Sequence, residues 1–227
     1  PATMGHTAHV PSASPVLRPG LRTFKPRRSR ITPRQRRALS DRSYPLLAPT
    51  DLAAAWPADR PVIIDIGFGS AGPVIDLATE FPDQTILAID IHTPGIGDLV
   101  DRCRTERVDN VLVIEADALD LLPALPHPAA GFRSFFPDPW PKARHHKRRL
   151  VQPAVVQAVH EHLVSGGYWH IATDWAPYAE AIQEVFDGDD RWTGGVIDRP
   201  DWRPITHFER RAIRDDRSVV DMWFERK

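Results

Sequence analysis

The sequence predicts an α/β protein with a mostly parallel sheet and helices on both faces. Short apolar runs alternate with amphipathic stretches between residues 61 and 173, which is the pattern of strand–helix–strand units. The apolar runs contain few polar residues, as expected for strands that are buried on both faces. With 227 residues, the chain is long enough for one such core. We therefore expect a single domain over residues 41–227.

The predicted elements follow one another in a regular order. The first strand covers residues 61–66, and Pro73 marks the first turn of the next helix, where a missing amide donor costs nothing. The later elements are a strand over 85–90, a helix over 96–107, strands over 111–115 and 132–136, a helix over 152–163 and a strand over 168–173. Because ligands bind at the carboxyl ends of such strands, we expect the chemistry there.

The first 40 residues form a basic arm. They contain nine Arg or Lys residues and no acidic residue, whereas the remainder carries 20 basic against 30 acidic residues. Prolines and small polar residues dominate the start of the chain, so residues 1–40 are predicted to be largely disordered. A basic segment of this kind either contacts a polyanion or only keeps the protein in solution.

Cysteine and hydropathy patterns favour a cytoplasmic protein. Cys103 is the only cysteine, so an intrachain disulfide is excluded. No stretch approaches the roughly 18 apolar residues of a membrane span, and the N-terminus lacks an apolar signal core.

Acidic residues follow three of the predicted strands. The glycine turn at 65–69 reads Asp-Ile-Gly-Phe-Gly, in which Gly67 and Gly69 allow close approach of a ligand. Asp90 ends the second strand, where a carboxylate can bind ribose hydroxyls, and Asp117 could receive an adenine amino group. This pattern indicates an adenosine-containing cofactor. An acid at position 65 suits a cationic sulfonium better than the pyrophosphate of NAD.

The most specific passage is Phe-Phe-Pro-Asp-Pro-Trp-Pro-Lys at 135–142, followed by Ala-Arg-His-His-Lys-Arg-Arg at 143–149. Asp138 stands between two prolines and is therefore presented with little conformational freedom. Trp140 either takes part in the site or only closes the core. The basic run is suited to phosphates.

These residues resemble the bacterial tRNA (guanine-N7)-methyltransferases, which carry Phe-Phe-Pro-Asp-Pro-Trp, a Lys and a His-His-Lys-Arg-Arg run. Further similar segments are 91–97, 172–175, 177–179 and 206–209, and the resemblance spans residues 22–227. Two departures stand out. Ala71 replaces the third glycine of the usual turn, and His207 stands where a Lys is common.

The resemblance implies a class I methyltransferase, a Rossmann-like fold with a seven-stranded sheet whose last two strands form an antiparallel hairpin, here at 206–212 and 219–226. It implies S-adenosylmethionine as the methyl donor, S-adenosylhomocysteine as the product and guanosine 46 of tRNA as the target. The implied cofactor-binding residues are Asp65, Gly67, Gly69, Asp90, Ile91, Asp117, Ala118 and Asp138. The implied substrate-binding residues are Lys142, Asp174, Thr206, His207, Phe208 and Glu209, and the implied RNA-binding residues are Arg144, His145, His146, Lys147, Arg148 and Arg149.

The chemistry of this reaction places modest demands on the protein. Guanine N7 exposes a lone pair, so no strong general base is needed, and alignment of the reactants is the main task. Asp138 is the predicted catalytic residue, because a carboxylate can follow the charge that develops on the guanine. Asp174 or Glu209 could recognise the guanine edge. Alternatively, Glu209 forms a surface ion pair with Arg210, Arg211 or Arg214.

Other interpretations stay open at this point. Another class I methyltransferase would keep the cofactor acids, a noncatalytic tRNA-binding protein would use the basic arm alone, and a nicotinamide oxidoreductase is a more distant alternative. The histidines lack the spacing of a metal site, so no metal is expected. We expect tRNA as partner, a monomer or homodimer, and no obligatory protein subunit.

Overall fold

A computed structural model describes residues 22–24, 30–41 and 43–227, and it contains an eight-stranded sheet. The strand order is β1-β4-β3-β2-β5-β6-β8-β7, in which β8 is antiparallel to β6 and β7 and the other neighbouring strands are parallel. The strands are β1 (Leu46–Leu47), β2 (Val62–Ile66), β3 (Thr85–Asp90), β4 (Val111–Glu115), β5 (Ala129–Phe135), β6 (Leu163–Thr173), β7 (Trp192–Ile197) and β8 (Val220–Arg226).

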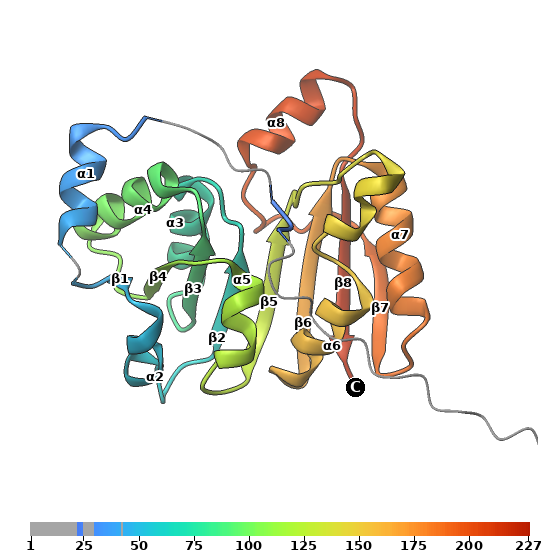
Figure 1. The fold of residues 1–227 in the computed structure, drawn as a ribbon, viewed down its shortest axis with the longest axis horizontal. Helices are drawn as coiled ribbons and strands as arrows, with labels where there is room; N and C mark the ends of the chain where they lie inside the picture. The colour runs from blue at the N-terminus through green and yellow to red at the C-terminus, as the bar shows by residue number, and fades with distance from the viewer. Residues whose placement is uncertain (1–21, 25–29, 42) are drawn as a thin grey trace, which may run out of the picture.

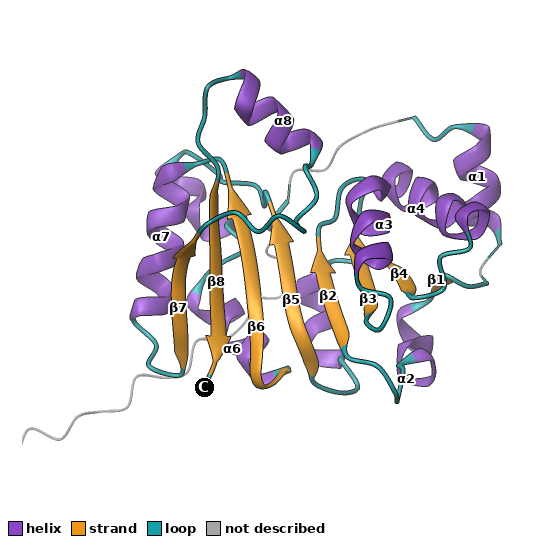
Figure 2. Ribbon diagram, turned by 180° about the vertical axis from the view of Figure 1, so that it is seen from behind, coloured by secondary structure: helices purple, strands orange, loops and turns teal. Residues whose placement is uncertain are grey.

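Helices cover both faces of this sheet (Figures 1 and 2). One face carries α2 (Leu52–Ala55), α5 (Ala118–Leu121), α6 (Pro153–Glu161) and α7 (Ala176–Asp187), and the other carries α1 (Pro33–Ser40), α3 (Ala71–Glu80) and α4 (Thr93–Glu106). Helix α8 (His207–Arg214) lies beyond one end of the strands (Figure 1). The 3₁₀ turns are η1 (Pro49–Asp51), η2 (Leu122–Ala124) and η3 (Ala143–Arg148).

The order of the strands reverses at β2. From β2 the chain moves outward through β3 to β4, and it then returns to β5 on the other side of β2. A ligand site is therefore expected at the carboxyl ends of these strands, where the connections part. The predicted α/β class and the mostly parallel sheet are confirmed, and each predicted strand from 61–66 to 168–173 overlaps an observed one.

The prediction for the terminal hairpin is wrong in one of its two strands. Residues 207–214 form helix α8, and the strand that pairs with β8 is β7. The helix begins there because the Thr206 side chain accepts a hydrogen bond from the Glu209 amide at 3.1 Å, which is an N-cap. The sheet also gains the two-residue strand β1 beside β4, which makes eight strands rather than seven.

The core is divided into one cluster on each face of the sheet. One cluster contains Leu87, Ile114, Val156 and Trp169, and the other contains residues of α3 and α4 such as Ile75 and Leu99. Because the strands are packed on both sides, their side chains are buried almost throughout. Among the described residues, no helix is long and apolar enough to cross a membrane.

The described part of the basic arm includes a folded element. Helix α1 packs against α4, and its Gln35 lies so close to Gly97 that a Cβ there would come within 2.9 Å of the Gln35 Cβ. The Thr32 side chain and Gln35 form a capping box at the start of α1. The remaining part of the arm, residues 1–21 and 25–29, lies outside the described residues.

Candidate active site

A tight glycine turn follows β2. Gly67 and Gly69 have φ values of 72° and 68°, in the left-handed region that favours glycine. A Cβ at Gly95 would come within 2.6 Å of the Gly69 carbonyl oxygen, so α4 packs directly against the turn. The turn can therefore bring its backbone close to a ligand. Ala71, which replaces the family's usual glycine, is buried at the start of α3.

Asp90, at the end of β3, binds the glycine turn through backbone amides. Its Oδ2 accepts a hydrogen bond from Gly69 N at 2.7 Å. Its Oδ1 accepts hydrogen bonds from Ile91 N at 2.6 Å and His92 N at 2.8 Å. Because each carboxylate oxygen has two lone pairs, Asp90 retains acceptor capacity for the hydroxyl groups of a ligand.

Asp117 plays a similar part after β4. Its side chain accepts a hydrogen bond from Leu119 N at 3.0 Å and so caps α5, which begins at Ala118. Burial raises the pKa of Asp117, and the hydrogen bond from Leu119 opposes this effect. Asp117 therefore lies just after the carboxyl end of β4, and one of its carboxylate oxygens accepts a hydrogen bond from a backbone amide.

Asp65 lies on β2 just before the turn and is more deeply buried than Asp90, with 3% against 9% of the residue exposed. Burial raises the pKa of its carboxyl group to about 7, the charge of Arg133 opposes the shift, and the charge of Asp90 adds to it. Arg133 on β5 is level with Asp65 on β2 and is itself only 1% exposed. Asp65 is therefore not among the described residues that line the cavity, although the sequence predicts it as a cofactor-binding acid.

The loop after β5 holds Asp138 in a strained backbone. Phe136 and Trp140 have φ values of 57° and 44°, which bulky residues rarely adopt. Trp140 is buried, its Nε1 donates a hydrogen bond to the Thr23 carbonyl oxygen at 3.0 Å, and Arg148 lies over its ring. Trp140 thus both closes the core and fixes the loop that presents Asp138.

These strand ends surround one cavity of about 230 Å³. Three of the predicted acids line it, namely Asp90, Asp117 and Asp138. The other lining residues are Thr23, Phe24, Ile66, Gly67, Gly69, Ile89, Ile91, His92, Ala116, Ala118, Phe136, Pro137, Leu150 and Phe208. Apolar walls with a few carboxylates fit a ligand that combines an aromatic base with hydroxyl groups and a positive charge.

Several lining residues were not predicted from the sequence. Thr23 and Phe24 come from the basic arm, and nothing in the local pattern marks them as part of a pocket. Phe136 and Pro137 belong to the specific passage at 135–142, so the fixed conformation of that passage was the available signal. Leu150 follows the basic run and closes the cavity from the side of η3.

The predicted substrate residues are distributed differently. Phe208 lines the cavity and stacks on Phe136, with the ring centroids 6.1 Å apart. His207 is exposed and lies beside the ring of Phe208, and Lys142 is an exposed residue that precedes η3. Asp174 forms an ion pair with Arg217 at 3.0 Å.

Glu209 makes buried ion pairs rather than the surface pair expected as the alternative. Its carboxylate contacts Arg199 and Arg203, each at 2.8 Å. Only 3% of Glu209 is exposed, because the residue faces the sheet.

The basic run forms the short turn η3. Arg144, Lys147 and Arg148 are exposed, which suits contact with phosphates. Arg149 is different because it is buried, its Nε donates to the Pro139 carbonyl oxygen at 2.9 Å, and it lies over the Tyr178 ring. In this structure Arg149 therefore holds the Asp138 loop.

Comparisons with known proteins agree with this geometry. The family model described as "Putative methyltransferase" matches residues 59–222. A tRNA (guanine-N(7)-)-methyltransferase of Nitrosospira multiformis is 40% identical over 227 residues, which cover 98% of this chain and 97% of that protein. One of Aeromonas hydrophila subsp. hydrophila is 38% identical over 219 residues, which cover 91% of this chain and 92% of that protein.

A solved structure is similar in fold. It is a mutant of the 16S rRNA (adenine(1408)-N(1))-methyltransferase from Catenulisporales acidiphilia with cosubstrate SAM, and its TM-score is 0.56 at 14% sequence identity. The match covers 78% of this chain and 91% of that one. The fold and the strand-end site together define a methyltransferase of the class that uses S-adenosylmethionine. At the identities given above, the chain belongs to the tRNA (guanine-N(7)-)-methyltransferase family.

Proposed function

We propose that the protein transfers a methyl group from S-adenosylmethionine to N7 of a guanine in tRNA, and that this guanine is guanosine 46. The observation that carries the proposal is the convergence of Asp90, Asp117 and Asp138 on one cavity beside the glycine turn. Carboxylates from three strand ends meet there, and membership of the family supplies the substrate class.

The residues present fit the cofactor. Gly67 and Gly69 leave space where a Cβ would otherwise face the ligand, Asp90 is placed for ribose hydroxyls, and Asp117 is placed for the adenine amino group. Ile91 and Ala118 provide apolar contacts on either side. When bound, the cofactor supplies an electrophilic methyl group on a sulfonium. The negative charge of these acids favours such a cation.

The substrate side of the cavity is formed by Asp138, Phe136 and Phe208. The rings of the two phenylalanines offer flat apolar surfaces against which a guanine can be oriented. Because N7 already carries its lone pair, the protein needs to orient the base and exclude water. The Asp138 carboxylate stabilises the positive charge that develops on the guanine.

The tRNA itself is held outside the cavity. The exposed residues of η3, together with Lys142, form a basic surface adjacent to the Asp138 loop. The basic arm reaches the cavity through Thr23 and Phe24. We propose that the chain acts without an obligatory protein subunit, as a monomer or homodimer, in the cytoplasm where tRNA is found.

The test is methyl transfer from labelled S-adenosylmethionine to unmodified tRNA, with the product mapped by cleavage at N7-methylguanosine. We expect label at a single guanine of the variable loop. Cofactor binding without label in any tRNA would overturn the proposed substrate and leave the fold assignment in place. Label at another nucleotide would overturn the proposed position.

A further inference from the structure

A long insert separates the two strands of the terminal antiparallel pair. Residues 198–219 leave the end of β7 and return as β8, and they contain α8. Strand β7 lies at the outer edge of the sheet, whereas α8 lies beyond the ends of the strands (Figures 1 and 2). Phe208 of α8 lines the cavity together with Ile66 of β2. The insert therefore crosses several strands, and contacts along its path must hold it.

Trp202 and Arg203 make the middle of this path. The Trp202 ring meets the ring of Phe81 at 5.4 Å and that of His170 at 5.5 Å, in both cases edge to face. Arg203 lies over the rings of Phe135 and Phe136, at 5.6 Å and 5.9 Å from their centroids. The Arg203 side chain is fully buried.

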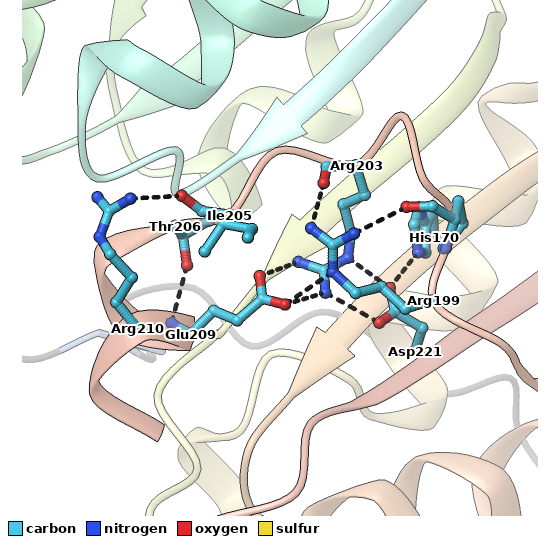
Figure 3. Close-up of polar contacts among 9 residues, drawn as sticks. His170, Arg199, Arg203, Ile205, Thr206, Glu209, Arg210 and Asp221 are labelled. Atoms are coloured by element: carbon cyan, nitrogen blue, oxygen red, sulfur yellow. Dashed lines mark hydrogen bonds and ion pairs between the residues drawn. The ribbon is translucent and has the colours of Figure 1, made fainter. Parts of the chain in front are cut away.

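Arg203 connects two carboxylates inside the protein (Figure 3). Its two terminal nitrogens donate to Glu209, from Nη1 to Oε2 at 2.8 Å and from Nη2 to Oε1 at 2.9 Å. Its Nη2 also donates to Oδ2 of Asp221 at 3.0 Å, and its Nε lies 2.7 Å from Oδ1 of the same residue. One guanidinium thus joins α8 to β8.

Two further residues complete the cluster. Arg199 donates from Nε to Oε1 of Glu209 at 2.8 Å and also contacts the Arg203 carbonyl oxygen. His170 on β6 lies with Nε2 2.8 Å from Oδ1 of Asp221, and burial lowers the pKa of His170, which favours the neutral ring. Two guanidinium groups therefore face two carboxylates, and the cluster is neutral overall.

The cluster sets the orientation of α8. Glu209 faces the sheet, while its neighbour Phe208 faces the cavity and stacks on Phe136. Adjacent helical residues differ in direction by about 100°, so fixing one of them fixes the other. Thr206 caps the same turn by accepting from Glu209 N. Any rotation of α8 that freed Glu209 would move Phe208 away from the cavity.

We propose that Arg203 and Glu209 are positioning residues that hold the first turn of α8, and with it Phe208, against the substrate side of the cavity. This inference rests on the proposed function for its catalytic readout. It assigns to Glu209 an anchoring role in place of recognition of the guanine edge, since both of its carboxylate oxygens accept hydrogen bonds from guanidinium groups. On the side of the sheet, the Arg203 guanidinium is held by Asp221 of β8, which also contacts His170 of β6.

The test compares Arg203→Met, Glu209→Gln and the double variant in the full-length protein. Hydrogen exchange is measured over 206–214 and over β2–β4, and kcat and KM are measured for S-adenosylmethionine and for tRNA. We expect exchange over 206–214 to become at least about 10-fold faster while β2–β4 keep their protection. Displacement of Phe208 should lower kcat by about 10- to 100-fold and leave the KM for the cofactor within about 3-fold.

The double variant separates anchoring from direct recognition. If the two residues act together as one anchor, kcat of the double variant should lie within about 3-fold of kcat of the more damaged single variant. Arg203→Lys, which keeps the charge but loses the planar fork, should recover part of kcat and part of the protection. Multiplicative losses of kcat, with exchange over 206–214 unchanged in Glu209→Gln, would overturn the proposal, because the two residues would then act independently.

Two controls keep the result interpretable. Arg191→Met breaks a partly exposed pair with Asp189 at the far end of the sheet, and it should change neither readout. If Arg203→Met does not fold, Arg199→Met takes its place, because it removes one guanidinium group from Glu209 at a partly exposed position. It should also speed hydrogen exchange over 206–214 and lower kcat, but by smaller factors. A wild-type protein that methylates no tRNA would refute the proposed function, while hydrogen exchange still decides whether the anchor exists.

Discussion

The acids at the strand ends and the acids near α8 have different partners. Asp90 and Asp117 line the cavity and accept hydrogen bonds from backbone amides, which carry only partial charges and so leave most of the carboxylate charge uncompensated. Asp174, Glu209 and Asp221 face guanidinium groups, which cancel their charge. A carboxylate that no guanidinium group offsets is the better partner for a cationic ligand, and this difference separates Asp90 and Asp117 from Glu209 and Asp221.

The largest effect that the comparison predicts is at Asp138. Asp138→Ala should lower the rate of methyl transfer by about 100-fold or more, because it removes the charge that stabilises the cationic product-like state. Single-turnover rates with saturating cofactor measure this step. Asp120→Ala, which removes an exposed acid from nearby α5, is the matched control and should retain the rate. An unchanged rate in Asp138→Ala would place Asp138 outside the chemistry.

The next effect concerns Asp90. Asp90→Ala leaves the amides of Gly69, Ile91 and His92 without their acceptor and removes the predicted ribose contact. Charge-assisted hydrogen bonds of this kind contribute about 1.5–3 kcal/mol each, so the affinity for S-adenosylmethionine should fall by about 10- to 100-fold. Titration calorimetry measures the affinity, and the exposed Asp109→Ala serves as control. Equal affinities for the two variants would contradict the assignment.

The two groups of acids also differ in how far the sequence could identify them. The alternation of strands placed Asp90 and Asp117 at strand ends, because parallel strands bring their carboxyl ends to one edge. The pairing of Glu209 with Arg203 depends on the path of the insert across the sheet, which no local pattern records. The resemblance implied a strand over 206–212, but Thr206 followed three residues later by Glu209 has the spacing of a capping box, and helix α8 begins there.

The exposed basic residues of η3 give a prediction about salt dependence. Replacing Arg144, Lys147 and Arg148 by Ala should weaken tRNA binding and lower the slope of log K against log salt by about 0.7–0.9 for each phosphate contact that is lost. Binding isotherms at several salt concentrations provide the slope. Arg149→Met should instead lower the thermal midpoint, because Arg149 is buried against Pro139 and Tyr178. A slope unchanged in the triple variant would exclude η3 from the RNA interface.

A smaller effect is expected from the titration of Asp65. Burial raises its pKa to about 7, so the carboxylate form increases between pH 6 and pH 8. Affinity for the cationic cofactor should therefore increase several-fold over this range, and Asp65→Asn should flatten that dependence. The stability of the protein without cofactor should change in the opposite direction. Because the Asp65 carboxyl group has a higher pKa in the folded than in the unfolded protein, the free energy of unfolding should decrease as the pH rises from about 4 to 7. Calorimetric titrations at both pH values, and thermal midpoints across the range, test the two signs.

The smallest expected effect is on stability at Asp174, whose ion pair with Arg217 is partly exposed. Pairs of this kind contribute at most about 1 kcal/mol, so Asp174→Asn and Arg217→Met should each change the unfolding free energy by less than that amount in chemical denaturation. Their methylation kinetics then decide the role of Asp174. If Asp174 only pairs with Arg217, both variants should retain the KM for tRNA. If it recognises the guanine edge, Asp174→Asn alone should raise this KM, and Asp174 would then move from the neutralised acids to those that bind a ligand.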